Sequence, residues 1–281
     1  MISVCIVNWE STEYLLRCLD SIARDPPTRG VEIEVADNGT RGFKVAEIAA
    51  LFPEVRWLLN AYNEGYARAN NEAVSWTSGE YIMLLNPDTE VTSEALDRLA
   101  AFLDQHPEVA AVAPKLVLPD GRTQRSCRGF PDPCPLFWET MGLARLFPNR
   151  FGRYRLRDFD HESTRPVDQP MFSAVMIRRE AWEQVAPLDE RFPIFFNDVD
   201  WCMRAKEAGW QIWFLAEATV IHHHGQSTRH MGRALIRESH RSLIELYQKH
   251  YRSRTPAPLY AAMIASIRVS GALRTVLPRR H

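Results

Sequence analysis

The chain has 281 residues, of which 46% are hydrophobic and 25% charged, and its formal net charge is −1. This composition predicts a soluble globular protein with one large or two small domains. No window holds 18 uncharged apolar residues, which argues against a transmembrane helix. The first residues lack the basic segment of a secretory signal, and the five cysteines include no C-x-x-C pair, as in proteins with reduced thiols. We therefore expect a cytoplasmic protein.

Strand-like and helix-like segments alternate along the first hundred residues. Buried strands are predicted at residues 2–7, 31–35, 55–59 and 82–85, and an amphipathic helix follows each of them. Ser93 is the predicted N-cap of the fourth helix. Four such alternations predict a mostly parallel central sheet covered by helices, which is an α/β fold.

The pattern is less regular in the second half of the chain. Further strands are predicted at residues 109–118, 171–178, 210–215 and 219–222. Between residues 127 and 170, prolines and aromatic residues interrupt every period, which predicts a long excursion of the kind that often forms a lid. A helix is predicted to begin near Asn197 as its cap and to end at Gly209 as its C′ residue.

Polar residues cluster where the first four strands end. The clusters lie at residues 8–10, 37–39, 60–65 and 86–88. If the strands are parallel, all four clusters meet at one edge of the sheet, where α/β proteins bind ligands. The glycine-rich fingerprints G-x-G-x-x-G and G-x-x-x-x-G-K-[ST] are absent. Any phosphate group would then be held by a divalent cation on a carboxylate.

Several of these polar residues have two interpretations. Asp37 accepts the ring N–H of uracil or thymine, or it closes an Asx turn with Asn38. Asp88 is a ligand residue or an ordinary turn residue. In the run that begins at His222, alternation puts His222 and His224 on one side of the strand, so the three histidines cannot all bind one metal easily. A metal-binding and a structural role both stay open for His222.

The acidic residues at the start of the helix near residue 197 also have two interpretations. Asp198 and Asp200 would favour the positive end of the helix dipole. Alternatively, the apolar pair Phe195-Phe196 desolvates Asp198 enough for it to act as a base. Asp198 and Asp200 lie about 200° apart around a helix of 3.6 residues per turn, so they cannot point at one spot.

The last part of the chain is basic and contains an apolar stripe. Residues 226–281 hold eleven Lys or Arg and two acidic residues. This excess predicts membrane headgroups or nucleic acid as a partner, or simply a solvated helix face. Beyond a break at residues 255–258, the stripe predicts association with a membrane surface, or packing on the catalytic domain or on a second subunit. The stripe consists of Tyr260, Met263, Ile264 and Ile267.

Six motifs together resemble the family 2 glycosyltransferases with a GT-A fold, most closely the rhamnosyltransferase-like members. In chain order they are Val7-Asn8-Trp9, Asp37-Asn38-Gly39, Asn63 to Asn70, Asn86-Pro87-Asp88, Phe195 to Arg204, and His222-x-x-Gly225-x-Ser227. Two positions depart from the family pattern. Asn86 stands where many relatives have the first aspartate of D-x-D, and Asn197 stands where they have a glutamate.

The resemblance implies a catalytic domain over residues 1–225, with a nucleotide-sugar half at 1–120 and an acceptor half at 121–225. Residues 226–281 would form a helical, basic extension. The implied reaction is an inverting transfer of a sugar, rhamnose above all, from a dTDP- or UDP-sugar to a hydroxyl of a glycan or lipid-linked acceptor. This reaction belongs to polysaccharide biosynthesis, in the cytoplasm or at the inner face of the membrane, without nucleic acid.

The resemblance also assigns roles to residues. Asp37 would read the base, Asp88 with His222 would hold Mg²⁺ or Mn²⁺, and Asp198 would take the proton of the acceptor hydroxyl. The implied donor-binding residues are Asn8, Trp9, Glu10, Asp37, Asn63, Gly65, Asn70 and Asn86. The implied acceptor-binding residues are Asn197, Asp200, Trp201 and Arg204.

Two other functions compete with this interpretation. A metal-dependent sugar nucleotidyltransferase shares the architecture, but it generally needs a glycine-rich, basic loop after the first strand, and residues 8–13 contain no glycine, lysine or arginine. A non-catalytic nucleotide-sugar or nucleic-acid binding module would use the basic end of the chain. Asp88, Asp198 and His222 together disfavour this module, and no aromatic-and-basic signature for single strands is present.

Overall fold

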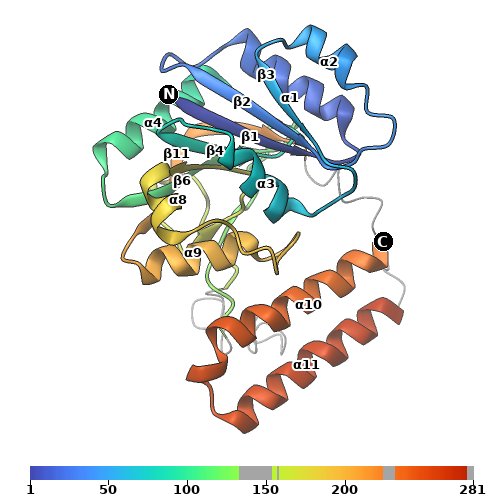
Figure 1. Cartoon of the computed structure of the whole chain (residues 1–281). Helices are drawn as coiled ribbons and strands as arrows, with labels where there is room; N and C mark the ends of the chain where they lie inside the picture. Colours follow the sequence, from blue (N-terminus) through green and yellow to red (C-terminus); the bar gives the residue numbers. More distant parts are fainter. Residues whose placement is uncertain (133–153, 157, 224–231, 277–281) are drawn as a thin grey trace.

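A computed structural model describes residues 1–132, 154–156, 158–223 and 232–276, and Figure 1 shows its arrangement. Nine strands of these residues form one mixed sheet. Eight of them follow the order β3 (Val55–Leu59), β2 (Val31–Asp37), β1 (Ile2–Asn8), β4 (Tyr81–Leu85), β10 (Ala174–Arg178), β6 (Val109–Val117), β11 (Gln211–His222) and β5 (Thr89–Glu90). Strand β8 (Arg165–Pro166) pairs with β11, and β7 (Cys127–Arg128) with β9 (Gln169–Pro170) makes a small second sheet.

The first four strands are parallel, as predicted. Asn8 of β1 pairs with Asp37 of β2, and Asp37 pairs with Leu59 of β3, so these strands end at the same level. Strand β4 runs parallel to β1 on its other side, whereas β10 is antiparallel to both β4 and β6. The prediction of a mostly parallel α/β fold is confirmed.

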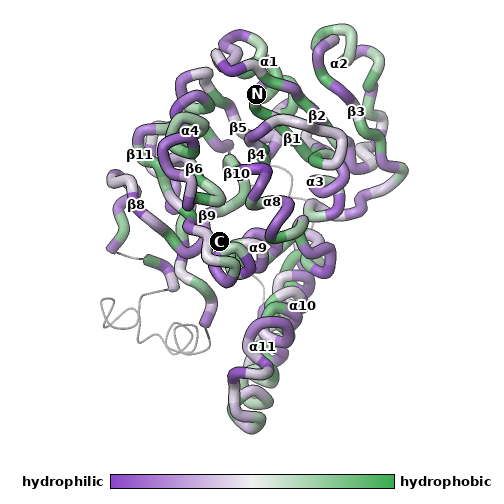
Figure 2. Tube along the Cα trace, turned by 60° about the vertical axis from the view of Figure 1, so that its left-hand side comes forward, coloured by the Kyte–Doolittle hydropathy of each residue, from purple (hydrophilic) through white to green (hydrophobic). Residues whose placement is uncertain are grey.

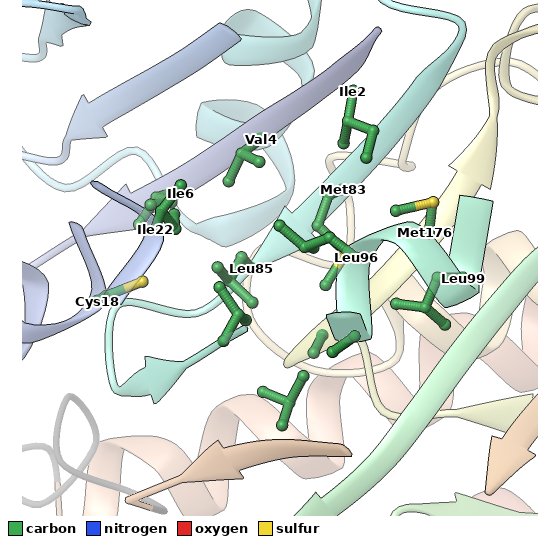
Figure 3. Close-up of a cluster of buried hydrophobic side chains, with 14 of the residues drawn as sticks. Ile2, Val4, Ile6, Cys18, Ile22, Met83, Leu85, Leu96, Leu99 and Met176 are labelled. Atoms are coloured by element: carbon green, nitrogen blue, oxygen red, sulfur yellow. The ribbon is translucent and has the colours of Figure 1, made fainter. Parts of the chain in front are cut away.

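Helices cover both faces of the sheet (Figure 1). On one face lie α1 (Thr12–Arg24), α2 (Val45–Leu51) and α4 (Ser93–Gln105). On the other face lie α3 (Tyr66–Ser75), α8 (Arg179–Val185) and α9 (Asn197–Glu207). Side chains of β1 alternate between the two layers, since Ile2, Val4 and Ile6 join the first core and Cys5 and Val7 the second. Figure 3 shows part of the first core, and the burial of both faces explains the continuous apolar runs of these strands.

The chain ends in a helical hairpin of α10 (Gly232–His250) and α11 (Ala257–Val276), joined by the short 3₁₀ turn η1 (Arg252–Arg254). Helix α9 lies between the sheet and α10 (Figure 1), and the hairpin projects from the body of the molecule (Figure 2). The apolar stripe predicted for a membrane is buried in a third core, which also contains Phe192, Leu246 and Tyr247. Of the predicted alternatives, packing on the protein is therefore confirmed for Tyr260, Ile264 and Ile267. These side chains do not face a membrane.

Several predicted boundaries change. Thr92, not Ser93, caps α4, because its hydroxyl accepts a hydrogen bond from the Ala95 N–H at 3.2 Å. The cap of α9 is Phe196 rather than Asn197. Gly209 follows α9 with φ +93°, as its predicted C′ role requires.

Three predicted segments also differ from the structure. The strands predicted at 210–215 and 219–222 form the single strand β11, which has an irregularity between them. The strand predicted at 171–178 is restricted to 174–178. Residues 133–153, about half of the predicted excursion, lie outside the described residues, as do Gly225 and Ser227 of the last motif.

Candidate active site

A cavity of about 360 Å³ opens at the carboxyl edge of the parallel strands. Its first wall comes from the strand ends, as the four polar clusters predict. Its second wall comes from residues 171–173 and from the chain entering α9. The lining residues are Val7, Trp9, Asn38, Asn63, Tyr66, Asn86, Pro87, Asp88, Met171, Phe172, Ser173, Ile194, Phe195, Phe196, Asn197, Asp198 and His222.

Asp88 and His222 meet on the first wall although they are far apart in the sequence. Strand β5 places them, because Thr89 pairs with His222 across to β11 and the His223 N–H donates to the Asp88 carbonyl at 2.8 Å. His222 Nε2 lies 3.4 Å from Asp88 Oδ1. Both side chains are buried, so the pair is held in a fixed arrangement.

Gln124 orients the ring of His222 and was not found from the sequence. Its Oε1 lies 2.8 Å from His222 Nδ1. An amide oxygen only accepts hydrogen bonds, so Nδ1 is the donor in this contact, and Nε2 is the ring nitrogen that faces Asp88. Nothing in the spacing of the chain links Gln124 to a histidine 98 residues later, so no sequence signal could have identified it.

This donor set fits a divalent cation. A carboxylate oxygen and an imidazole nitrogen are both common metal ligands, and a second partner that fixes the ring is typical of metal-binding histidines. In the described ranges, no three His, Cys, Asp or Glu residues come close enough to form a metal site by themselves. Asp88 and His222 would therefore supply two ligands, and Mg²⁺ sites typically add oxygens of a substrate phosphate to such a pair.

Asp37 lies beneath the cavity rather than in its lining. Its Oδ1 accepts a hydrogen bond from Asn8 Nδ2 at 2.8 Å, and its Oδ2 accepts from the Thr40 N–H at 2.9 Å. The Thr40 bond is the local bond of the turn interpretation, whereas Asn8 lies 29 residues earlier on the neighbouring strand β1, and the Asp37 side chain is buried. Glu10 points away, where its carboxylate pairs with Arg41 at 3.2 Å.

Asn38 organises the edge of the cavity, a role beyond the turn that the sequence predicts for it. Its Nδ2 donates to Asn63 Oδ1 at 3.0 Å and to the Gly65 carbonyl at 3.1 Å. Its Oδ1 accepts from Asn60 Nδ2 at 3.1 Å and from the Glu64 N–H at 3.2 Å. One asparagine therefore joins the end of β2 to the whole β3–α3 loop.

Gly65 and Asn70 have structural roles off the cavity. Gly65 has φ +92°, and a Cβ there would lie 2.7 Å from the Cβ of Pro193. The lack of a side chain lets the N–H groups of Tyr66 and Ala67 reach the Pro193 carbonyl, at 2.5 and 3.2 Å, which draws the second wall against the first. The Asn70 amide donates to the Tyr66 carbonyl at 2.9 Å.

Asp198 faces the cavity from the first turn of α9. Its Oδ1 accepts a hydrogen bond from the Val199 N–H at 2.8 Å. Burial raises the pKa of this carboxyl above its ordinary value, and the Val199 hydrogen bond and the charge of Arg128 only partly oppose the rise. A carboxylate with a raised pKa is a stronger base at neutral pH.

Its neighbours Asp200, Trp201 and Arg204 do not reach the cavity, contrary to the acceptor-binding prediction. Asp200 is fully buried and accepts a hydrogen bond from Arg204 Nε at 2.8 Å. Trp201 is fully buried against Phe172 and Trp182. The helical period explains the split, because successive residues of one motif turn to different sides. Of the four predicted acceptor residues, Asn197 alone lines the cavity.

Known proteins resemble the chain in sequence and fold. The family model "Glycosyl transferase family 2" matches residues 3–182. The N-acetylglucosaminyl-diphospho-decaprenol L-rhamnosyltransferase of Mycobacterium tuberculosis is 27% identical over 81% of this chain and 78% of its own length. The mannosyltransferase PcManGT of Pyrobaculum calidifontis, solved with GDP-Man and Mn²⁺, superposes with a TM-score of 0.61 at 18% identity, over 98% of this chain and 72% of that one.

A further solved structure, GalNAc-T7 with UDP, GalNAc and Mn²⁺, has a TM-score of 0.59 at 17% identity; it covers 79% of this chain, which spans 43% of the length of GalNAc-T7. Within the described residues, the helices are all too short or too polar to cross a membrane. The family match covers well over half of the chain and agrees with the fold around the cavity. The chain therefore belongs to glycosyl transferase family 2 and is a rhamnosyltransferase-like enzyme with the GT-A fold.

Proposed function

We propose that this enzyme transfers a sugar from a nucleoside-diphosphate sugar to an acceptor hydroxyl, with inversion at the anomeric carbon. The observation that carries the proposal is the placement of two different acidic groups on facing walls of one cavity. Asp88 with His222 lies on the strand-end wall, and Asp198 lies on the α9 wall. A single displacement needs these two functions, a site for the leaving diphosphate and a base for the attacking hydroxyl.

In this mechanism, Asp88 and His222 would hold Mg²⁺ or Mn²⁺, which would supply positive charge for the leaving diphosphate. Trp9, Asn38, Asn63 and Asn86 line the side where the donor would bind. Asp198 accepts the proton of the acceptor hydroxyl while that oxygen attacks the anomeric carbon, and its raised pKa suits it for this step.

The donor is proposed to be a dTDP- or UDP-sugar, with dTDP-rhamnose as the leading candidate. The Mycobacterium tuberculosis relative is named a rhamnosyltransferase for a diphospho-decaprenol acceptor, which supports rhamnose and a lipid-linked acceptor here. Base recognition by Asp37 requires a ligand to reach beneath the cavity and to share the carboxylate with Asn8 and Thr40. A carboxylate has about four lone-pair sites, so it can accept one more hydrogen bond.

Thermal unfolding with a panel of nucleotide sugars tests the donor assignment. A ligand at 100 times its Kd stabilises the folded state by about 2.7 kcal/mol. We expect dTDP-rhamnose with Mn²⁺ to raise Tm and GDP-mannose to raise it less. Transfer to N-acetylglucosaminyl-diphospho-polyprenol then tests the reaction. No shift with any nucleotide sugar, or GDP-mannose binding as well as dTDP-rhamnose, would contradict the donor assignment, and formation of a nucleotide-sugar bond instead would support the nucleotidyltransferase alternative.

We also propose that the outward side of α11 rests on an anionic membrane at the cytoplasmic face. Leu259, Val269 and Leu273 are more than half exposed on this helix, which has no acidic residue. Arg268 and Arg274 lie beside them, and each basic residue near an anionic surface adds about 1 kcal/mol of attraction. The positive charge favours anionic lipid over a second, equally positive copy of the helix.

Vesicle flotation tests this surface. The triple variant Leu259→Ser, Val269→Ser and Leu273→Ser should lose binding to phosphatidylglycerol vesicles, while the control Leu51→Ser and Trp76→Ser, at exposed residues near α2 and α3, should keep it. Equal flotation of both variants would contradict the proposal. A wild-type dimer that the triple variant disrupts, without vesicle binding, would assign the surface to a second copy instead.

A further inference from the structure

The C-terminal hairpin reaches the helix that carries Asp198 through buried charged groups. Asp200, in the first turn of α9, has no exposed surface. Besides Arg204, its carboxylate accepts from Lys249 Nζ at 2.6 Å and from His250 Nε2 at 2.7 Å. We infer that Lys249 and His250, the last two residues of α10, are positioning residues that hold the first turn of α9, and with it Asp198, in place for transfer. This inference rests on the function proposed for Asp198.

The buried carboxylate depends on these two partners. Its Oδ2 is bound to Arg204, whereas its Oδ1 receives both residues of α10. Without them a buried charge would keep a partner on one oxygen only, which is strongly unfavourable. The first turn of α9 would then shift to bring Asp200 toward water. Such a shift separates α9 from α10.

The same end of α10 also makes other contacts with α9 and with the segment before it. Lys249 Nζ also lies 2.7 Å from Asp189 Oδ2, in the segment before α9. Apolar packing accompanies the charges, because Val199 and Met203 of α9 share a core with Leu246 of α10. The junction is therefore a packed interface with a charged centre.

The start of α9 has a backbone conformation that needs such support. Phe196 adopts φ +67° at the N-cap, in the left-handed region that residues other than glycine rarely enter. Conformations of this kind persist where the surroundings hold them. The Asp200 N–H donates to the Phe196 carbonyl at 2.9 Å, so Asp200 closes the turn that contains Asp198. A displacement of Asp200 therefore also displaces Asp198, because both residues belong to the same turn.

The chain offers a matched control at the other end of α9. Arg254, just after α10, pairs with Glu207 at 3.0 Å, but both side chains are largely exposed. Exposed ion pairs contribute little to stability. Arg254→Ala thus removes a charge contact between the same two parts of the chain without touching the first turn.

The experiment compares His250→Ala, His250→Gln and Arg254→Ala in the full chain. We expect His250→Ala to lower kcat for rhamnosyl transfer by roughly 10- to 100-fold, the cost of a small misplacement of reacting groups. Its affinity for dTDP should stay unchanged, because Asp88 and His222 lie on the strand-end wall and not on α9. His250→Gln should recover most of the rate, since its amide N–H can donate to Asp200, and Arg254→Ala should match the wild type.

Hydrogen exchange of the Asp200 amide provides a second readout that does not depend on transfer. Faster exchange in His250→Ala, but not in Arg254→Ala, supports the junction. Unchanged exchange would overturn it, and faster exchange with an unchanged kcat would overturn the positioning role. If the wild type transferred no sugar at all, the proposed function would fail, while exchange would still decide whether α10 holds this turn.

Discussion

The strand-end wall and the α9 wall face the same cavity but are held in different ways. At the strand ends, polar side chains bond to one another, as Asn8 does to Asp37 29 residues later and Asn38 to Asn63. On the α9 wall, Asp200 depends on His250, 50 residues farther along the chain. Apart from the Asp88–His222 pair, which joins distant segments, the strand-end wall is therefore built from neighbouring strand–helix units, whereas the proposed base sits on a helix that the end of the chain completes.

The sharpest test of the α9 wall is Asp198→Asn. We expect kcat to fall by about 10²- to 10⁴-fold, the usual cost of losing a general base, because the amide cannot take the proton. Donor affinity and folding should persist. Steady-state kinetics measure the effect, and Glu180→Gln, in the equivalent first turn of α8, is the control. Near wild-type turnover of Asp198→Asn would show that Asp198 is not the general base.

The strand-end wall is tested by Asp88→Ala. We expect affinity for dTDP to fall on the order of 100-fold, or about 2.7 kcal/mol, because the cation loses its carboxylate ligand. Calorimetric titration with Mn²⁺ measures the change, and EDTA added to the wild type should reproduce it. Glu90→Gln is the control, since Glu90 pairs with His223 instead. Equal affinity with EDTA and with Mn²⁺ would break the assignment of Asp88.

The contact that draws the two walls together is tested by Gly65→Ala. A side chain at φ +92° costs about 1–2 kcal/mol, and its Cβ would also overlap Pro193. We expect the free energy of unfolding in urea to drop by about 2 kcal/mol or more. Gly42→Ala provides the comparison, because Gly42 has φ +69° with nothing near its missing Cβ. If both variants lost the same stability, the close approach to Pro193 would not matter.

The smallest effect concerns the pH dependence of stability. Because burial raises the pKa of Asp198, its ionised form is less favourable in the folded state than in the unfolded state. This destabilisation is complete above the folded pKa and disappears below the ordinary value of about 3.9. Asp198→Asn should therefore be more stable than the wild type at neutral pH, and the gain should vanish in acid.

Asp200 gives the opposite sign and sharpens the comparison. Burial alone would raise its pKa, but the hydrogen bond from His250 and the charges of Arg204 and Lys249 lower it. Its ionised form therefore stabilises the folded state above the ordinary pKa, and this stability is lost as pH falls through the lowered pKa. Asp200→Asn should be less stable at neutral pH, with the difference shrinking in acid. Urea titrations across pH 3–7 separate the two carboxylates, and parallel behaviour would contradict their distinct surroundings.

Much of the sheet edge could be predicted because its signals are local. Apolar runs and the turn residues after them place Asn63, Asn86 and Asp88 at the ends of strands, and parallel pairing then brings them to one edge. The motif around Asp198 placed it at a helix start beside the cavity. These inferences need only the period of each element and its order in the chain.

The remaining features depend on contacts between distant segments. No period reveals that Gln124 orients His222 or that His250 meets Asp200. The stripe on α11 shows the same limit, because an amphipathic helix has one pattern whether its apolar side meets lipid or protein. Tyr260 and Ile264 turned out to meet protein. The sequence also does not predict the net effect of two opposing contributions to a pKa. For Asp198, burial raises the pKa by more than its hydrogen bond lowers it.

The anomeric configuration of the product tests the central claim most directly. If Asp198 deprotonates an acceptor that attacks the donor in one step, the sugar must leave with its anomeric configuration inverted. NMR of the product formed from dTDP-rhamnose and N-acetylglucosaminyl-diphospho-polyprenol measures this through the coupling of the anomeric carbon and proton. We expect inversion relative to the donor. Retention would contradict the account, because it requires a different set of steps at the cavity between Asp88 and Asp198.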